Sequence, residues 1–284
     1  MSYKGAERGR PWTVKVTVGR PTSSEEGPAL VAAVEAPKSQ YEQIADLLRA
    51  RILDGTYPPG SALPSEPALS AELGISRVTV NRAIGLLRTA GLVKVRRGSG
   101  TYVRSLPQII RDAKRRYGAR ERGTGAGEVE VREMDLRSRT EYREIAQVPA
   151  TPEVAQALDI AEGTNVLVRR RVLYANDEPT QIADSYYPWE IAKDSALLLA
   201  DTGKGGSYSR LAEMGYSIAR FMEDVNVRMP IDAERRTLQL EATQPVFDIV
   251  HIALTATDQR IEAAFHVMPG HLWTLRYAWE DEAS

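Results

Sequence analysis

One helical stretch of the sequence carries exposed side chains that are suited to contact a polyanion. In "RVTVNRAIGLLRT", a period of 3.6 residues places Arg77, Asn81, Arg82 and Arg88 on one face. The stretch contains no carboxylate, whereas an ordinary solvated helix mixes charges of both signs. Guanidinium groups pair with phosphates and with guanine edges, and an Asn amide pairs with adenine. This face is therefore predicted to enter the major groove of duplex DNA.

A second basic element follows this helix in the chain. The segment "RRGSG", residues 96–100, lies between the alternating stretches "LVKV" and "TYV". That pattern predicts a β-hairpin with a glycine-containing turn. The hairpin tip supplies cations for an adjacent minor groove or its phosphates, and a plain basic turn is the alternative interpretation.

The elements that must position these residues are two further helices. Apolar residues at helical spacing in "YEQIADLLRARILDG" predict a first helix that stops at Gly55. Ser65 is expected to cap a short second helix that ends at Gly74, and Ser76 to cap the basic helix. The inward stripe of the basic helix is Val80, Ala83, Ile84 and Leu87. The three helices and the hairpin together predict a winged helix-turn-helix.

Composition separates the chain into segments of opposite charge. The 284 residues have a net charge of -1, yet residues 38–122 hold 16 Lys and Arg against 7 Asp and Glu. Residues 123–284 hold 16 against 27, so a polyanion is expected to bind only the first module. The absence of cysteine, and of any long apolar run, favours a cytoplasmic, nucleoid-associated protein without a membrane partner.

The predicted domain organisation has four parts. Residues 1–37 form an N-terminal extension without persistent structure, 38–105 the winged helix-turn-helix, and 106–127 a basic linker. Residues 128–280 mix helices and antiparallel strands. The fold class is therefore α+β.

The segments "GTYPPGSALPSE", "LGISRVTVNRA" and "GLVKVRRGSGTYV" resemble the winged helix of the GntR family. The segments "VRRRVLYANDEP", "DSYYP", "GSYSRLAEMGY" and "PVFDIVHIA" resemble the UTRA domain of its HutC subfamily, whose fold is similar to chorismate lyase. The resemblance covers about residues 38–280.

This resemblance implies a homodimeric transcription factor, most often a repressor. Such a protein binds a pseudo-palindromic operator in double-stranded DNA and leaves it when a small-molecule effector binds the second domain. No cofactor is expected. Family pattern and charge together give the candidate DNA-contacting residues Lys38, Ser65, Ser76, Arg77, Thr79, Asn81, Arg82, Arg96, Arg97, Gly98 and Ser99.

The candidate effector site also follows from the resemblance. Arg169 and Arg171 lie on the strand that holds an anion in relatives, and Glu262 matches an acidic position that contacts a polar ligand group. Ser207 and Tyr208 open a helix after "GKGG", where free backbone N–H groups attract anions. The alternative for the two arginines is salt bridging on a solvated sheet face.

Two other functions of the second domain stay open at this point. The domain could serve dimerisation alone, without an effector. An enzyme on the chorismate lyase-like fold is the other alternative, but the sequence offers neither a cysteine nucleophile nor a metal motif. If the final hairpin turns at Asp258 and Gln259, His251 and His266 lie directly opposite each other, as a cross-strand pair rather than a metal site.

Overall fold

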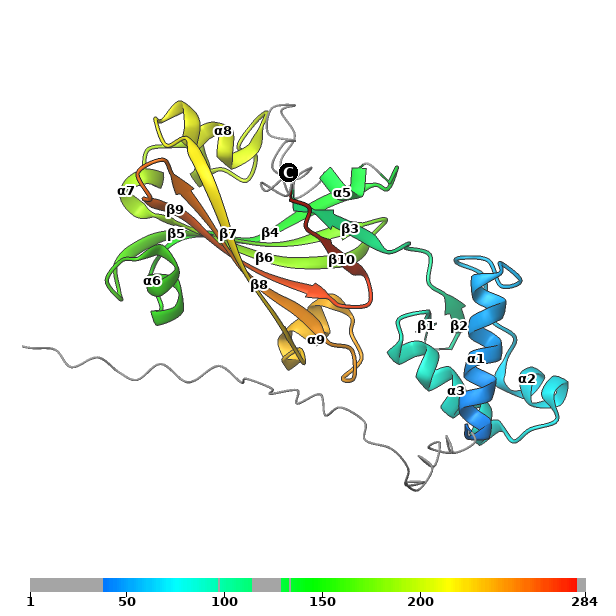
Figure 1. Ribbon diagram of the computed structural model, residues 1–284. Helices are drawn as coiled ribbons and strands as arrows, with labels where there is room; N and C mark the ends of the chain where they lie inside the picture. Colours follow the sequence, from blue (N-terminus) through cyan, green and yellow to red (C-terminus); the bar gives the residue numbers. More distant parts are fainter. Residues whose placement is uncertain (1–37, 97, 114–128, 133, 280–284) are drawn as a thin grey trace, which may run out of the picture. The chain divides into compact units, whose positions relative to one another are not determined.

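The computed structural model describes residues 38–96, 98–113, 129–132 and 134–279. The described residues from Ser39 onward belong to one compact unit, in which a small helical domain is followed by a larger sheet domain (Figure 1). The predicted extension at residues 1–37 lies outside the described residues.

The helical domain is a winged helix-turn-helix, as the sequence predicts. Its elements are α1 (Gln40–Leu53), α2 (Glu66–Leu73), α3 (Arg77–Thr89) and the antiparallel wing strands β1 (Val93–Arg96) and β2 (Gly100–Val103). Gly74 ends α2 in the left-handed conformation with φ 66°, which glycine adopts without strain. The predicted inward stripe of α3 is buried, and it packs with Leu48, Leu69 and Val93.

The sheet domain is built on one six-stranded antiparallel sheet with strand order β4-β5-β6-β9-β8-β7. Its strands are β4 (Ser138–Pro149), β5 (Asn165–Ala175), β6 (Glu178–Pro188), β7 (Ile218–Arg228), β8 (Val246–Thr255) and β9 (Arg260–Pro269). Its short helices are α5 (Val129–Arg132), α6 (Pro152–Leu158), α7 (Trp189–Ala192), η2 (Ala196–Leu198), α8 (Gly206–Glu213) and α9 (Asp232–Leu238). The α+β prediction is confirmed.

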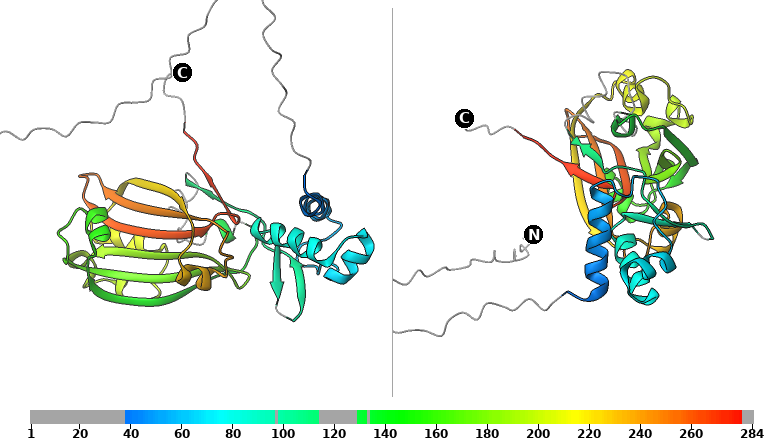
Figure 2. Two further views of the ribbon diagram at one scale, coloured as in Figure 1. Left: turned by 90° about the horizontal axis from the view of Figure 1, so that it is seen from below. Right: turned by 90° about the vertical axis from the view of Figure 1, so that its right-hand side faces the viewer.

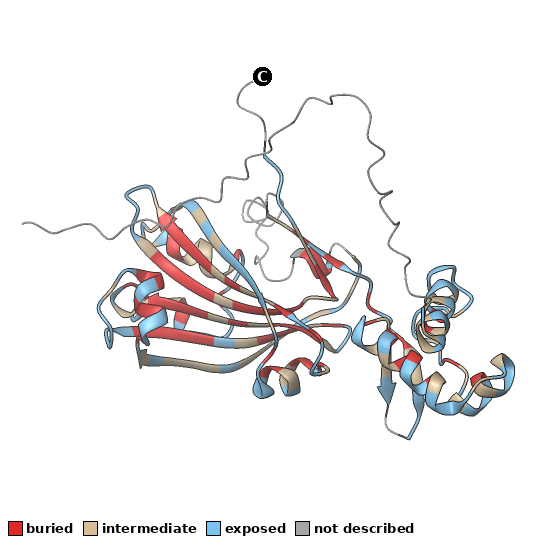
Figure 3. Cartoon of the chain, turned by 60° about the horizontal axis from the view of Figure 1, so that its bottom comes forward, coloured by how far each residue is buried: buried red, intermediate tan, exposed pale blue. Residues whose placement is uncertain are grey.

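Helices pack against part of each face of this sheet, and Figure 3 shows the buried stretches of its strands in red. On one face α6 packs over Val166, Val168 and Ile252. On the opposite face α7, η2 and α8 pack over Leu167 and Ala253 (Figure 2). Strand pairing fixes which residues share a face, because side chains alternate along each strand. The second face is the one that carries the buried polar groups described below.

The first part of the predicted linker is not a linker. Residues Ile109–Asp112 form β3, which pairs in parallel with β10 (Trp273–Arg276) at the C-terminal end of the sheet domain. Ile109 and Arg111 are buried there. The sequence did not reveal this strand, because its surroundings are basic in composition and its partner lies more than 150 residues away in the sequence. The rest of the predicted linker, 114–128, lies outside the described residues.

No helix among the described residues is long and apolar enough to cross a membrane.

His271 lies where the sheet domain meets the winged helix at Gly91. Burial, followed by the nearby cations Arg104 and Lys94, lowers the pKa of His271 to about 4. Neither ring nitrogen has a hydrogen-bond partner among the described residues. The imidazole is therefore neutral in the folded protein at every pH well above 4.

This shift predicts a loss of stability at acidic pH. Between pH 6.5 and 4 the unfolded state binds a proton at His271 and the folded state does not, so the free energy of unfolding falls as the pH falls. A shift of this size contributes roughly 2 to 3 kcal/mol. Urea unfolding at pH 7.0 and 4.5 measures it, with His271→Asn as the non-titrating control. An equal pH dependence in both proteins would contradict the prediction.

Candidate nucleic-acid interface and buried polar cluster

The N-terminal half of α3 is an exposed, basic surface. Arg77, Asn81 and Arg82 are all exposed, as the helical spacing predicts. Ser76 starts the helix, because its hydroxyl accepts from the Thr79 backbone N–H at 3.1 Å and contacts the Thr79 hydroxyl at 2.9 Å. These caps fix the angle at which the helix leaves the turn. The helix therefore presents its first two turns to solvent.

Asn81 has a partner that the sequence did not reveal. Its side-chain amide donates to Glu66 Oε1 in the first turn of α2, at 2.8 Å. Ser65, another candidate contact residue, caps the same turn through the Ala68 backbone N–H at 3.3 Å. Glu66 stands 15 residues earlier in the chain, so no local pattern pointed to it. The contact holds the amide oriented while leaving its oxygen and one N–H for another group.

The wing is braced by Tyr102, a residue that sequence reasoning missed. The Arg96 guanidinium lies over the Tyr102 ring, 4.4 Å from its centroid. The Ser99 hydroxyl lies 2.7 Å from the Tyr102 hydroxyl. Gly98 forms the turn with φ 75°. Arg97 lies outside the described residues, and Lys38 is exposed before α1.

Gly85 sits on the outward face of α3 and packs against nothing. A Cβ added there would meet no atom within 4 Å among the described residues. Tight packing on a neighbouring helix therefore does not explain this glycine. It lines an open groove with Tyr41, Arg82 and Thr89 on one side and residues 241–243 on the other.

The sheet domain carries its buried polar groups on the face beneath α8. The strand register places Arg171 across from Ala183, Ser185 across from Ala264, and His251 across from Ala264 on the far side. These positions share one face because the register pairs them directly. The other members of this buried set are Arg169, Gln181, Tyr187, Glu223, Glu262 and His266.

Arg169 does not lie on a solvated surface. It is 1% exposed, and its guanidinium donates to the carbonyl oxygens of Leu197, Leu199 and Ala200 and to the Tyr142 hydroxyl. The salt bridges expected on a solvated face belong instead to its neighbour Arg170. Arg169 thus holds the η2 segment onto the sheet.

Arg171, Ser207 and Glu262 gather around Tyr187. Arg171 donates to the Ser185 hydroxyl at 2.8 Å, and Tyr187 donates to Glu262 Oε1 at 2.5 Å. Burial, followed by the neighbouring Glu262 charge, raises the pKa of Tyr187, whereas a hydrogen bond from Ser207 acts in the opposite direction.

Arg171 and Glu262 are neighbouring groups of opposite charge that no described ion pair joins. Burial alone would lower the pKa of Arg171, but Tyr187, Tyr142 and Glu262 outweigh it and raise the pKa. Arg171 and Glu262 thus act on each other, although no ion pair joins them among the described contacts. Glu262 is 2% exposed, and its Oε2 has no partner within the described part of the chain. A buried carboxylate oxygen without a donor is costly unless a ligand supplies one.

Tyr208 points into a second network on the same face. Its hydroxyl lies 3.1 Å from His251 Nε2, and His251 Nδ1 lies 3.0 Å from Glu223 Oε1. Glu223 also accepts from Arg111 of β3 and, at 3.0 Å, from the Tyr277 hydroxyl. Burial and the Glu223 charge raise the pKa of Tyr277 to about 12. Sequence reasoning missed Arg111 and Glu223, since neither belongs to a motif.

The predicted face-to-face histidine pair is wrong in register. His251 pairs with Ala264 and His266 with Ile249, so the two rings are diagonal neighbours whose centroids are 6.2 Å apart. The cause is the position of the connection, residues 256–259, which sets Leu254 opposite Arg260; the bulge between Ala253 and Leu254 shifts the register by only one residue. Within the described residues, no group of three acidic or histidine side chains could hold a metal ion.

Comparison with known proteins agrees with this architecture. The model for bacterial regulatory proteins of the gntR family matches residues 40–103, and the UTRA domain model matches residues 133–272. The uncharacterized HTH-type transcriptional regulator SCO4628 of Streptomyces coelicolor is 31% identical over 256 residues, which are 87% of this chain and 93% of the relative. The histidine utilization repressor of Pseudomonas aeruginosa is 30% identical over 224 residues, which are 79% and 85% of the two chains.

A solved structure shares the fold. PhnF from Mycobacterium smegmatis superposes with a TM-score of 0.55 at 21% identity, and the match covers 84% of this chain and 99% of PhnF.

A winged helix with a basic reading surface, followed by a UTRA domain, defines a DNA-binding transcriptional regulator. The chain belongs to the GntR family and is of the HutC type. The prediction of a regulator rather than an enzyme is confirmed by this family membership and by the named relatives.

Proposed function

We propose that this regulator is a homodimeric repressor that binds an inverted-repeat operator and is released by a small effector. The observation that carries the DNA part is the exposed acid-free face of α3 beside the braced wing. A helix of this kind reads base edges with its N-terminal residues, and two copies of it read half-sites about 34–36 Å apart when one helical turn separates them.

The edge strand β7 supports the dimer. Its exposed apolar side chains continue into the following turn: Met222, Val225, Val227, Met229 and Ile231. An unpaired edge with this apolar content is suited to cover by a second copy of the chain. Sedimentation of Val227→Lys against wild type tests this surface, and an unchanged dimer would exclude it.

The candidate effector residues Arg171, Ser207 and Glu262 support a ligand site beneath α8. Because Glu262 is buried and Arg171 is half-buried, and no ion pair joins them among the described contacts, the site suits a small zwitterion. Its amine would donate to Glu262 and its carboxylate would accept from Arg171. Arg169 and Tyr208 act beside this site, by holding the η2 segment and by contacting His251.

A thermal-shift screen tests the effector proposal. Zwitterionic amino acids are compared with matched acids that lack the amine, on the wild type and on Glu262→Gln. We expect stabilisation by a zwitterion in the wild type alone. Equal responses of the two proteins would overturn the site, and no response to any compound would favour a domain that only dimerises.

Selection of bound fragments from random and genomic DNA, at moderate and high salt, tests the operator proposal. An enriched inverted repeat whose affinity falls steeply with salt is expected, because cations of α3 and the wing replace counterions on the phosphates. Weak binding to all fragments without enrichment would overturn it.

The half-site is expected to carry an A·T pair opposite Asn81. The family often has Arg at this position, and Arg reads guanine whereas Asn prefers adenine. Asn81→Arg should therefore shift the selected sequence toward G·C at one position per half-site. Because the introduced guanidinium also lies within reach of Glu66, the double variant with Glu66→Gln serves as a control. An unchanged binding-site logo in both variants would refute this assignment.

A further inference from the structure

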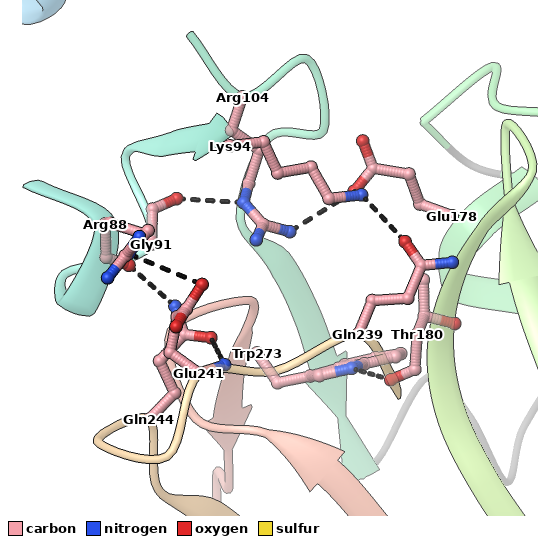
Figure 4. Close-up of polar contacts among 10 residues, drawn as sticks. All are labelled: Arg88, Gly91, Lys94, Arg104, Glu178, Thr180, Gln239, Glu241, Gln244 and Trp273. Carbon is pink, nitrogen blue, oxygen red and sulfur yellow. Dashed lines mark hydrogen bonds and ion pairs between the residues drawn. The ribbon is translucent and has the colours of Figure 1, made fainter. Parts of the chain in front are cut away.

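The winged helix contacts the sheet domain through one polar surface, which we call the seam (Figure 4). Its residues on the winged helix come from the end of α3 and the base of the wing: Arg88, Thr89, Gly91, Lys94 and Arg104. Its residues on the sheet domain are Glu178, Gln239, Glu241, Thr243, Gln244 and His271.

One half of the seam holds the C-terminal end of α3. Gln244 donates from its amide to the Arg88 carbonyl oxygen at 2.8 Å, and the same oxygen accepts from the Gly91 backbone N–H at 2.9 Å. The Arg88 guanidinium lies 3.4 Å from Glu241, and the Thr89 and Thr243 hydroxyls lie 3.0 Å apart.

The other half of the seam holds the base of the wing. Glu178 at the start of β6 pairs with Lys94 at 3.0 Å and with Arg104 at 3.3 Å. Arg104 also donates to the Gly91 carbonyl oxygen at 2.8 Å. The side chains of Glu178 and Arg104 are 18% and 13% exposed, so water screens this cluster only partly. Trp273, which donates to the Thr180 carbonyl oxygen at 2.8 Å, anchors the neighbouring β10 to β6.

At Gly91 the two domains approach each other too closely for any side chain larger than that of glycine. A Cβ at this position would lie 2.2 Å from the His271 ring and 2.8 Å from its Cβ. Only glycine allows this approach, and its φ of 70° also favours glycine.

The seam takes Arg88 from the predicted DNA-facing side of α3, but it leaves the first two turns of the helix and the tip of the wing free. None of its residues comes from the first two turns of α3 or from the wing tip, and Arg77, Asn81, Arg96 and Ser99 all remain exposed. A winged helix held by the seam can therefore approach DNA while its orientation on the sheet domain stays fixed.

Resting on the proposed function, we propose that the seam holds the winged helix in its operator-binding orientation, and that parting of the seam is the step that releases the operator. In a dimer, two winged helices fixed in this way present their reading helices at one spacing. Winged helices freed from the seam still bind single half-sites, but they lose the gain in affinity that comes from simultaneous binding of both.

A reversible crosslink tests the first part. The chain contains no cysteine, so Thr89→Cys/Thr243→Cys introduces one pair at positions whose hydroxyl oxygens are 3.0 Å apart. We expect an intramolecular disulfide, and an oxidised protein that binds the selected inverted repeat within about twofold of its reduced form. A loss of about tenfold or more on oxidation, reversed by dithiothreitol, would overturn the proposal. So would failure of the crosslink to form in a folded protein that binds DNA.

A second pair of variants tests release. Gly91→Ala introduces the clash with His271, and His271→Gly removes the ring and Cβ that it meets. We expect Gly91→Ala to weaken binding to the full inverted repeat by about tenfold and to leave binding to a duplex with one half-site within about twofold. The double variant should recover full-site affinity, although it keeps the same backbone strain at position 91.

The outcomes separate this proposal from the proposed function. Equal losses on the half-site and the full site, or no rescue by His271→Gly, would show a local defect of the winged helix and overturn the seam. If the wild-type protein selects no inverted repeat, the proposed operator itself fails, and the same titration shows this. His271→Gly alone is the matched control for the sheet domain.

Discussion

Replacing Arg77 with alanine is expected to weaken binding to the selected operator by about 1 to 3 kcal/mol, which is the usual value of one good base contact. Arg77 opens α3, is exposed, and stands where a recognition helix meets base edges. Removal of the Arg77 side chain should leave the fold of the domain unchanged, because the capping contacts of Ser76 do not involve this side chain. Fluorescence anisotropy with labelled duplexes at several salt concentrations measures the effect.

Arg236→Ala is the matched control for this prediction. Arg236 lies exposed on α9 of the sheet domain, and its removal changes the net charge by the same amount. A base contact by Arg77 predicts that the variant loses discrimination between the operator and a scrambled duplex. A phosphate contact predicts instead a uniform loss together with a salt slope reduced by about one. Equal operator affinities of Arg77→Ala and Arg236→Ala would contradict a contact between Arg77 and DNA.

Replacing Arg111 with methionine is expected to lower the free energy of unfolding by about 3 to 5 kcal/mol, because it leaves the Glu223 charge buried without its cation. Arg111 and Glu223 side chains are 2% and 8% exposed, and Arg111 belongs to β3, the strand that leads from the winged helix into the sheet domain. Glu223 keeps its contacts to His251 and Tyr277, neither of which carries a permanent positive charge. Urea unfolding measures the loss.

An exposed ion pair of the same type is the control. Arg139 lies 3.3 Å from Glu141 on β4, and both side chains are more than a third exposed. Arg139→Met should therefore leave the free energy of unfolding nearly unchanged. The double variant Arg111→Met/Glu223→Gln should recover much of the loss, because no unpaired buried charge remains. A loss in Arg111→Met no larger than that in Arg139→Met would contradict the assignment.

The sequence by itself determined the winged helix and the surface it presents. Ser65, Gly74 and Ser76 act on backbone groups within four residues, and the stripe of Val80, Ala83, Ile84 and Leu87 follows from the helical period alone. Such signals are local, so each can be recognised from a short segment of the sequence. The α+β class of the second domain followed in the same way from alternating strands and capped helices.

Only the tertiary structure decided which distant residues meet. The pairing of β3 with β10 turned part of a predicted linker into a buried strand, and it brought Arg111 to Glu223. The turn of the last hairpin lies earlier in the chain than the sequence predicted, so His251 stands opposite Ala264, two residues from His266. Arg169 and Arg171 share a face of the sheet. The guanidinium of Arg169 is bound by carbonyl oxygens of the η2 segment, whereas Arg171 lies beside Glu262.

The seam belongs to the same class of fact. Gly91 and His271 are 180 positions apart, and nothing near either residue in the sequence indicates that a Cβ at one would collide with the other. Contacts of this kind depend on how the two domains pack. The free energy of that packing is the sum of many weak interactions between residues far apart in the sequence. Local sequence signals therefore determine the winged helix, and packing between the two domains determines its orientation on the sheet domain.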